Sequence, residues 1–350
     1  MRPCDLILPI CLVVTIYCPC WAFGQPICFS VGAFAVKYKD IELAAQIGIE
    51  IIHEYRFEES PDKDDEVAEY LDKAKQYKIK VMLGFDRGLN YNERRIVERV
   101  NRFKNHDALW GWYLVDEPKE DMKDRIKSIA KVIKQLDVTH PTLISSDNPE
   151  FIEIADINFA YEYPIWDKPY PKSDLSLYTH RTQLSRTLNT KFLSLLQTFN
   201  YSYYRPKDPK KYLYRYPTVV EIRNMAYTGI ILGSSGLFFF SFQTLPNDRS
   251  YLDNVIVPLI LEFKRIRPFL AWEVTSMPKS IEINGNLLCK CWLSGKEVFV
   301  MVVNPGPLRI AVKINVKYKK NISMNVSPPG NESLEPWGTS FYQIDLRDNF

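Results

Sequence analysis

Between positions 27 and 266, segments with the hydrophobic spacing of helices alternate along the chain with short apolar runs typical of strands. Segments with helical spacing are clearest over 119–136, where Met122, Ile126 and Ile129 recur every three or four residues. Short apolar runs predict eight strands, at 27–36, 50–55, 80–85, 109–115, 142–146, 155–163, 191–199 and 237–242. Eight strands with intervening helices in about 250 residues predict an α/β fold, a (β/α)8 TIM barrel. An open doubly wound sheet is the alternative, and it is disfavoured because no glycine-rich phosphate loop follows any predicted strand.

Local signals mark some element ends. Thr218 and Glu221 form a capping box that starts a helix, and Gly233 is placed to end it. The segments 165–190 and 200–216 show no clear period and are rich in Tyr, Pro and Lys. We therefore expect both to be long loops near the barrel mouth.

The pattern changes after about residue 272. Short alternating runs predict strands at 280–283, 287–293, 297–303, 309–316 and 340–344, separated by glycine-containing turns. We expect two domains after the leader: a barrel over 25–273 and a small antiparallel, β-sandwich-like domain over 274–350. The second domain lacks clustered acids, so a structural role is expected, with carbohydrate binding as the alternative.

The first 24 residues resemble a signal peptide. Arg2 precedes an apolar run at 6–22, and small residues suit cleavage near Gln25. Pro9 and Pro19 interrupt the run, which favours a removable signal over a permanent anchor. The sequence thus predicts a secreted, extracellular or periplasmic protein, and N-glycosylation sequons lie at Asn200, Asn321, Asn325 and Asn331.

Three cysteines, Cys28, Cys289 and Cys291, would remain after cleavage. Cys289 and Cys291 lie two apart on one predicted strand, too far apart to bridge comfortably. One disulfide with Cys28 and three free thiols both stay open. No zinc spacing is visible and the chain has only 4 histidines, so we expect no metal and no cofactor.

Charge places limits on the partner. The 45 basic and 42 acidic residues are interspersed and give a net charge of +3, with no basic stripe or tail. We therefore expect no nucleic-acid partner and no stable membrane insertion, and a carbohydrate fits the balance. The sequence leaves the oligomeric state open.

The candidate chemistry lies in residues 108–118, an apolar and aromatic strand that ends in Asp116, Glu117 and Pro118. Catalytic groups of a parallel barrel collect at the carboxyl ends of its strands. Two adjacent carboxyls there can divide labour, one protonated and one ionised, if their surroundings push their pKa values apart. Burial of Glu117 against aromatic walls would favour its neutral form, and an ionised Asp116 would add to this. The alternative is that the pair simply begins the next helix.

These residues resemble the fourth-strand signature of clan-A glycoside hydrolases, in a variant that reads Trp112-Tyr113-x-x-Asp116-Glu117-Pro118. The segment from Pro217 to Phe242 resembles the last helix and strand of such barrels, and the similarity spans roughly residues 26 to 273. The resemblance implies glycosidase activity, with Glu117 at the acid/base position and Asp116 where the clan usually has asparagine.

One position departs from the clan. Its nucleophile is a glutamate at the end of the seventh strand, and the corresponding place here holds Gln197. An amide cannot form the glycosyl ester of a retaining mechanism. Three schemes stay open. In the first, another carboxylate serves as nucleophile or base. In the second, the substrate's own 2-acetamido group attacks while Asp116 orients it, an arrangement that resembles certain hexosaminidase barrels. In the third, catalysis is lost and the barrel only binds glycan.

Further candidates for the substrate site lie at the other predicted strand ends. Tyr161, Tyr163 and Trp166 could stack on sugar rings, although packing is the alternative. Gln197 could hydrogen-bond a sugar or only the barrel top, and His53 is expected to be a structural hydrogen bonder. The candidates for the second carboxylate are Glu54, Asp86, Asp147 and Glu162, with salt bridges or turn formation as the alternatives. The sequence therefore predicts a secreted glycoside hydrolase, with a catalytically inactive carbohydrate-binding barrel or a structural secreted protein as the other possibilities.

Overall fold

The barrel is closed and its strands are parallel and in chain order. The computed structural model describes residues 29–58, 63–85, 93–188, 191–275, 281–284, 287–295, 297–317, 323–325 and 333–345. The barrel strands are β1 Ser30–Ala33, β2 Ile51–Ile52, β3 Lys80–Gly84, β4 Leu109–Asp116, β5 Thr142–Ser145, β6 Ile157–Tyr161, β7 Lys191–Gln197 and β8 Gly236–Phe240. The predicted TIM barrel is thus confirmed.

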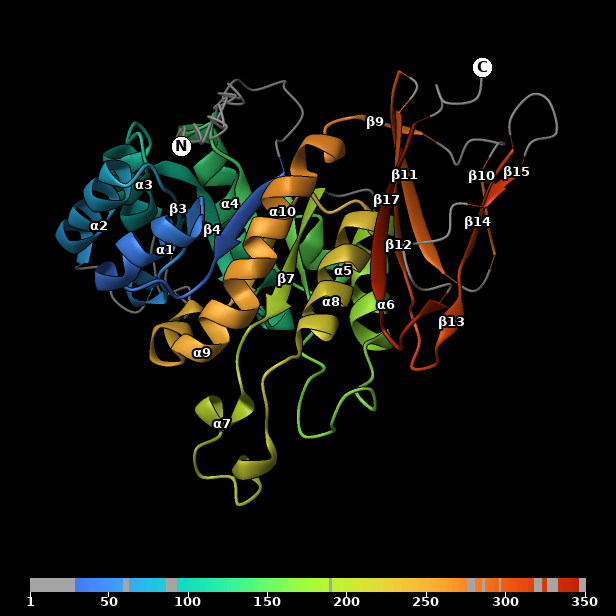
Figure 1. Ribbon diagram of the computed structural model, residues 1–350. Helices are drawn as coiled ribbons and strands as arrows, with labels where there is room; N and C mark the ends of the chain where they lie inside the picture. The colour runs from blue at the N-terminus through green and yellow to red at the C-terminus, as the bar shows by residue number, and fades with distance from the viewer. Residues whose placement is uncertain are drawn as a thin grey trace, which may run out of the picture.

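Helices surround the strands on the outside of the barrel (Figure 1). The α-helices are α1 Ile41–Ile47, α2 Asp64–Gln76, α3 Glu93–Phe103, α4 Lys123–Leu136, α5 Pro149–Ile152, α6 Ser176–Thr187, α7 Tyr201–Tyr204, α8 Val219–Leu232, α9 Arg249–Tyr251 and α10 Val257–Leu270. Short 3₁₀-helices are Tyr38–Asp40, Tyr55–Glu58, Glu120–Met122, Lys211–Leu213 and Phe242–Asn247, and Leu252–Ile256 forms a π-helical turn before α10.

Helix α6 lies inside the segment 165–190, which was expected to be a loop. Its buried residues are Tyr178, Thr182 and Ser185, spaced by four and then three positions on one face. Two of these three residues are small and polar, so the apolar periodicity that marks the other helices is absent. The loop prediction was wrong here because this helix packs a polar face.

Helix α8 is built as predicted. The Thr218 hydroxyl accepts from the Glu221 N–H, and the Glu221 carboxylate accepts from the Thr218 N–H. Gly233 ends the helix with φ 106°, a left-handed conformation that glycine adopts without steric cost.

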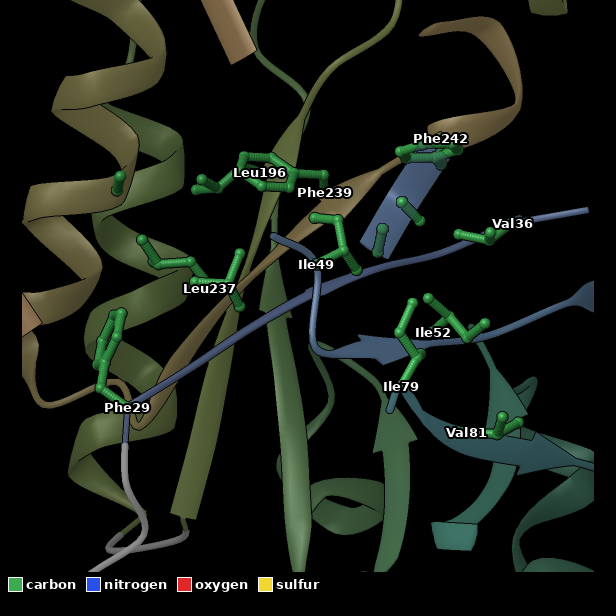
Figure 2. Close-up of a cluster of buried hydrophobic side chains, with 14 of the residues drawn as sticks. Phe29, Val36, Ile49, Ile52, Ile79, Val81, Leu196, Leu237, Phe239 and Phe242 are labelled. Carbon is green, nitrogen blue, oxygen red and sulfur yellow. The ribbon is translucent and has the colours of Figure 1, made fainter. Parts of the chain in front are cut away.

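Two apolar layers form the core. The outer layer lies between strands and helices, and Figure 2 shows part of it, including Ile52, Leu237 and Phe239. The inner layer fills the barrel with alternate strand residues, among them Phe34, Phe159 and Phe238. Ring centroids in this inner layer lie 4.9 Å apart for Phe34 and Phe159, in edge-to-face contact. The barrel interior is therefore a packed aromatic core that supports the mouth from below.

Antiparallel sheets follow the barrel, as predicted. Their strands are β9 Glu273–Thr275, β10 Ile281–Asn284, β11 Leu288–Ser294, β12 Glu297–Val303, β13 Ile310–Ala311, β14 Lys313–Lys317, β15 Ser323–Asn325, β16 Ser333–Leu334 and β17 Thr339–Asp345. The four-stranded sheet, in the order β17-β12-β11-β9, lies beside α8 (Figure 1). Phe299 stacks on Phe269 of α10 at 4.6 Å, and Asn224 of α8 donates to the carbonyls of Asn304 and Trp337. The exact domain boundaries, 25–273 and 274–350, stay predictions.

Several predicted features lie outside the described residues, namely the signal peptide at 1–24, Cys28, Asp86, Asn321 and Asn331. Cys289 and Cys291 are free thiols. Over the part of the chain that the structure describes, we find no helix with the length and apolar character needed to span a membrane.

Candidate active site

A β-bulge in β4 aims its terminal carboxylate into the barrel mouth. Tyr113 pairs with Leu143 of β5, but the next residue of β5, Ile144, pairs with Val115. Leu114 and Val115 therefore both join the outer core, while Tyr113 belongs to the inner one. Strict alternation would have turned Asp116 outward; the extra residue turns it inward, to the same side as Tyr113.

Asp116 is fixed by two tyrosine hydroxyls. Tyr55 donates to its Oδ2 at 3.0 Å and Tyr113 donates to its Oδ1 at 2.9 Å. The Tyr113 hydroxyl also lies 2.7 Å from Oγ of Ser145, at the end of β5. Burial raises the pKa of both tyrosines well above the ordinary value, and the charge of Asp116 raises it further. Both hydroxyls therefore stay protonated and hold one orientation of the carboxylate.

Glu117 lies at the rim of the mouth, with its side chain exposed. Its N–H donates to the carbonyl of Ser145 at 3.0 Å, which extends the β4–β5 ladder, and its φ is +49°. Burial raises the pKa of Tyr161, and Glu117 raises it further through its charge and a hydrogen bond. The carboxyl thus faces Tyr161 at the end of β6. It lacks the burial considered from the sequence, so in the free protein aromatic walls do not enclose it.

The left-handed backbone of Glu117 is uncommon for a residue with a Cβ atom. A non-glycine residue in this conformation is destabilised by about 1–2 kcal/mol. Such strain clusters at functional sites, where surrounding structure holds it in place. The bulge, the tyrosine contacts and the strain therefore occur together within four consecutive residues, from Leu114 to Glu117.

The three residues predicted to stack on sugar rings, Tyr161, Tyr163 and Trp166, pack against other aromatic rings of the protein. Tyr163 stacks on Phe240 at 5.2 Å and lies 5.7 Å from Tyr161. Trp166 stacks on Tyr201 at a centroid distance of 3.6 Å. Tyr161, Tyr163 and Trp166 all remain partly exposed at the mouth, so they combine a packing role with an accessible surface.

Gln197 is fully buried, and its amide is occupied by the backbone. Its Nε2 donates to the carbonyl of Ile165 at 2.7 Å, and its Oε1 accepts from the N–H of the same residue at 2.9 Å. Nε2 also donates to the carbonyl of Phe199 at 3.3 Å. The side chain thus pins the β6–α6 connection to the end of β7. All of these contacts agree with the interpretation in which Gln197 has a structural role and forms hydrogen bonds only to backbone groups at the top of the barrel.

Three other candidates point away from Asp116 or are paired with other residues. Glu54 accepts from the N–H of Arg56 at 3.1 Å, and burial raises its pKa. His53 and Tyr55 pack their rings together at 4.6 Å, so the residue between them is directed to the opposite side. Glu162 and Asp147 both pair with Arg181, at 3.7 and 2.7 Å. Asp86 lies outside the described residues.

Sequence reasoning missed the residues that support the pair from below. Tyr55 belongs to no motif, and Tyr113 was noted only as part of the fourth-strand pattern, with no role assigned to its hydroxyl. The contact of Tyr113 with Asp116 depends on the bulge. His53 is a buried hydrogen bonder as expected, with Nε2 2.5 Å from Oε1 of Glu58. Glu58 lies against Gly84, where a Cβ atom would come 2.1 Å from its Oε1. The available signals were the place of Tyr113 in the fourth-strand pattern and the period-2 placement of His53 and Tyr55.

The described residues contain no group of three or more His, Cys, Asp or Glu side chains arranged to hold a metal ion. A surface hollow lies away from the mouth, between α4 and α5, and lysines such as Lys127 and Lys131 line it together with Glu153. It contains neither Asp116 nor Glu117, so it plays no part in the candidate site.

Comparison with known proteins shows similarity of fold without similarity of sequence. No protein-family model matches the chain, and no curated protein is similar in sequence. A solved structure described as a glycoside hydrolase aligns over 92% of this chain and 91% of its own, with a TM-score of 0.59 and 10% identity. A glycoside hydrolase family 5 protein from Bacteroides vulgatus aligns over 92% and 87%, with a TM-score of 0.56 and 11% identity. An α-amylase from Geobacillus thermoleovorans, complexed with acarbose, aligns over 92% and 99%, with a TM-score of 0.52 and 9% identity. The barrel with its trailing β strands is thus an arrangement also found in glycoside hydrolases.

Proposed function

We propose that this chain is a glycoside hydrolase that cleaves O-glycosidic bonds of an oligo- or polysaccharide, with Glu117 as general acid/base and Asp116 as its orienting partner. The observation that supports it most is the geometry at the end of β4. There a bulge turns Asp116 inward onto two tyrosine hydroxyls and leaves Glu117 beside it in a strained conformation. The fold shared with glycoside hydrolases is consistent with this proposal.

The second catalytic group is the point at which the schemes differ. Among the described candidates, Glu54 is directed away, Glu162 and Asp147 pair with Arg181, and Gln197 is bound to the backbone. This favours the scheme in which the substrate supplies its own nucleophile. Asp86, outside the described residues, is the competing protein carboxylate.

In the favoured scheme, Glu117 protonates the glycosidic oxygen as the bond from that oxygen to C1 breaks. The carbonyl oxygen of a 2-acetamido group attacks C1, and the ionised Asp116 accepts a hydrogen bond from the acetamido N–H. Glu117, now ionised, takes a proton from a water molecule as that water attacks C1. The bond between C1 and the acetamido oxygen breaks in the same step, which restores the 2-acetamido group and releases the sugar. Because Glu117 is exposed in the free protein, the bound glycan itself would exclude water from it.

Glu117→Gln tests the proposal directly. Loss of a general acid lowers the rate by roughly 10²- to 10⁴-fold, so kcat on an unactivated oligosaccharide, whose leaving group must be protonated, should fall by that amount while binding is retained. Asp121→Asn is the matched control, since it removes an exposed acid four residues away. A broad panel that compares 2-acetamido with 2-hydroxy glycosides, together with Asp86→Asn, separates the two schemes. Normal turnover by Glu117→Gln would contradict the assignment.

A carbohydrate-binding barrel without catalysis is the second candidate. The occupied amide of Gln197 favours it, because the position where clan A has its nucleophile is used here for structure. In that case glycans bind, no panel member is cleaved by the native chain, and Glu117→Gln changes nothing but affinity.

Secretion is also part of the proposal. We infer an extracellular or periplasmic glycoprotein that carries glycan at one or more of the four sequons. Expression of the full chain in a secretory host, with N-terminal sequencing of the product and its mass before and after deglycosylation, tests both statements. An intact Met1 in the purified protein would contradict cleavage.

A further inference from the structure

Residues 200–214, here called the Tyr-Lys segment, project from the carboxyl end of β7 and carry α7 (Figure 1). Tyr212 is 79% exposed, Tyr203 48% and Leu213 44%. Arg205, Lys207, Lys210 and Lys211 are exposed on the same segment. Exposed aromatic rings among cations are typical of a ligand-binding surface, and here they project away from the body of the barrel.

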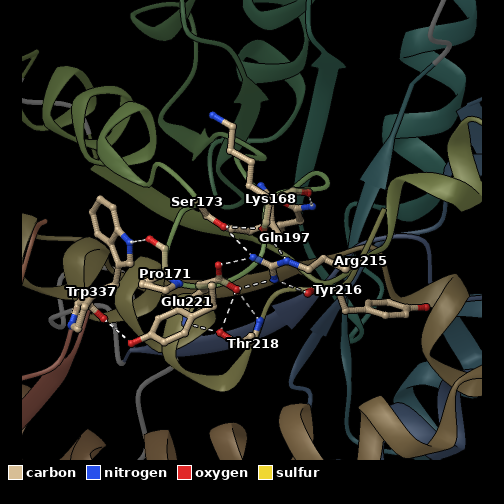
Figure 3. Close-up of polar contacts among 12 residues, drawn as sticks. Lys168, Pro171, Ser173, Gln197, Arg215, Tyr216, Thr218, Glu221 and Trp337 are labelled. Carbon is tan, nitrogen blue, oxygen red and sulfur yellow. Dashed lines mark hydrogen bonds and ion pairs between the residues drawn. The ribbon is translucent and has the colours of Figure 1, made fainter. Parts of the chain in front are cut away.

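The segment has a defined shape. At its base, Arg215 forms two parallel hydrogen bonds to the Glu221 carboxylate, at 2.8 and 2.6 Å (Figure 3). The same guanidinium donates to Oγ of Ser173 at 2.7 Å and to the carbonyl of Lys168 at 2.8 Å. The Asn200 side chain donates to the carbonyl of Tyr214 at 2.9 Å and so ties the two ends of the segment together. The exposed rings are therefore presented on a fixed loop.

Its positive charge is not balanced within the segment. Asp208 is the one acidic residue of the segment, and it accepts from the Tyr214 hydroxyl at 2.7 Å and from the Lys210 N–H at 2.8 Å. The Arg205 guanidinium lies 4.9 Å from the ring centroid of Trp166. Across the described residues, no carboxylate forms an ion pair with Arg205 or with the three lysines. Lys211 Nζ donates to the carbonyl of Pro206 at 3.0 Å, and the hydrogen bond from Tyr214 lowers the pKa of Asp208, with help from the charges of Arg205 and Lys210. Four cations nevertheless face one carboxylate in the segment, so an excess of positive charge remains for an anionic ligand.

The surface is continuous with the barrel mouth. Tyr204 stacks on Phe240 with centroids 6.1 Å apart, and its hydroxyl lies 2.7 Å from Oγ of Ser241. The Tyr201 hydroxyl donates to the carbonyl of Tyr163 at 3.0 Å. Aromatic residues thus lead without interruption from Tyr163 and Phe240, beside the candidate site, out to Tyr203. A ligand that follows this path is a chain longer than one sugar.

We propose that the Tyr-Lys segment binds an anionic polysaccharide whose chain continues from the barrel mouth. Pyranose rings place their apolar faces on the tyrosines, while carboxylate or sulfate groups pair with the lysines and Arg205. The choice of an anionic over a neutral glycan follows from the unbalanced charge, and the choice of a polymer follows from the continuity with the mouth. Binding at the segment does not require cleavage; only its link to the mouth rests on the proposed function.

Binding of two polymers to the full chain tests this proposal. Polygalacturonate supplies carboxylates, heparin supplies sulfates, and dextran is the neutral reference. The test variant is Lys207→Gln, Lys210→Gln and Lys211→Gln combined. The matched control is Lys127→Gln, Lys131→Gln and Lys264→Gln, which removes the same charge from exposed positions of α4 and α10. We expect at least one polyanion to bind, the test variant to lose roughly tenfold in affinity, the control to change less than twofold, and added salt to weaken binding.

Tyr203→Ala combined with Tyr212→Ala tests the aromatic contribution and should weaken binding of the same polymer severalfold. Equal loss in both triple variants, or equal binding of dextran, overturns the proposal. So does binding of phosphatidylserine vesicles through the segment when neither polyanion binds. If no glycoside is cleaved but segment-dependent polyanion binding persists, only the proposed function fails. If neutral 2-acetamido glycosides are cleaved and the test variant binds polyanions normally, only this inference fails.

Discussion

Strands β4 and β7 both end at the barrel mouth, and each presents a side chain with an amide or carboxyl group there. At β4 the chain is bulged and strained, and its two carboxylates are met by side-chain hydroxyls. At β7 Gln197 is buried, with its donor and acceptor both matched to the backbone of Ile165. Equivalent positions of one barrel thus differ in the hydrogen-bonding partners of their polar side chains. The carboxylates at the end of β4 can accept further hydrogen bonds from a ligand. The amide at the end of β7 instead bonds to the backbone and joins two loops.

The largest effect that tests this contrast is expected from Gln197→Glu. A carboxylate cannot donate to the carbonyls of Ile165 and Phe199, so these carbonyls would lose their donor and would face a buried negative charge. Only the N–H of Ile165 could still donate to that charge. A buried uncompensated charge destabilises a protein by about 3–5 kcal/mol. The free energy of unfolding from urea denaturation at pH 7 measures the change. Gln135→Glu, at an exposed glutamine of α4, is the control and should change stability by less than about 0.5 kcal/mol.

Gln197→Glu also tests whether the end of β7, unlike the end of β4, has only a structural role. If Gln197→Glu keeps its stability and gains a covalent glycosyl intermediate with an activated fluoro-glycoside, the β7 end is a dormant nucleophile position. The contrast with β4 would then be wrong.

A second, smaller effect sharpens the description of β4. Tyr55→Phe removes one of the two donors to Asp116 while the ring contacts with His53 stay possible. A hydrogen bond to a charged group contributes about 1.5–3 kcal/mol. Under the proposed function we expect kcat to fall about tenfold or more, with little change in KM. Tyr38→Phe, on an exposed tyrosine whose ring packs under Lys73, should leave kcat unchanged, and equal loss in both variants would remove Asp116 from the proposal.

The smallest effect concerns the strained backbone. Glu117→Gly should raise the free energy of unfolding by about 0.5–1 kcal/mol, because relief of left-handed strain exceeds the entropy that glycine loses. Lys78→Gly is matched, since Lys78 is exposed and has φ +58°. Both variants should gain stability, and only Glu117→Gly should lose activity. If Glu117→Gly is less stable than the native chain, the side chain of Glu117 serves the fold, and the strain is not evidence of function.

Much of the fold was predictable, because the apolar runs and the caps of α8 are local signals. The barrel and the trailing β strands followed from them. Helix α6 was missed because Thr182 and Ser185 occupy its buried face. Periodicity detects apolar faces only, so a helix that packs small polar residues is not visible to it.

The candidate site was predictable in position but not in detail. The Asp116–Glu117 pair follows from its place at the end of a buried strand. Its orientation depends on one extra residue in β4, and the register of a bulge cannot be read from alternation, which it breaks. The role of Tyr55 and the backbone contacts of Gln197 depend on residues more than thirty positions away in the chain. Such contacts arise only when the barrel closes.

The anchor between Arg215 and Glu221 has a consequence for acid tolerance. Burial alone would raise the pKa of Glu221, but hydrogen bonds from Arg215 and from the N–H of Thr218 outweigh it and hold the pKa below the usual value. A depressed folded pKa means that this contribution to stability is complete above the unfolded value of about 4.3 and fades only as the pH falls through the lower, folded value. The loop that Arg215 supports therefore keeps its conformation at an acidic pH at which a glutamate without such hydrogen bonds would already be protonated.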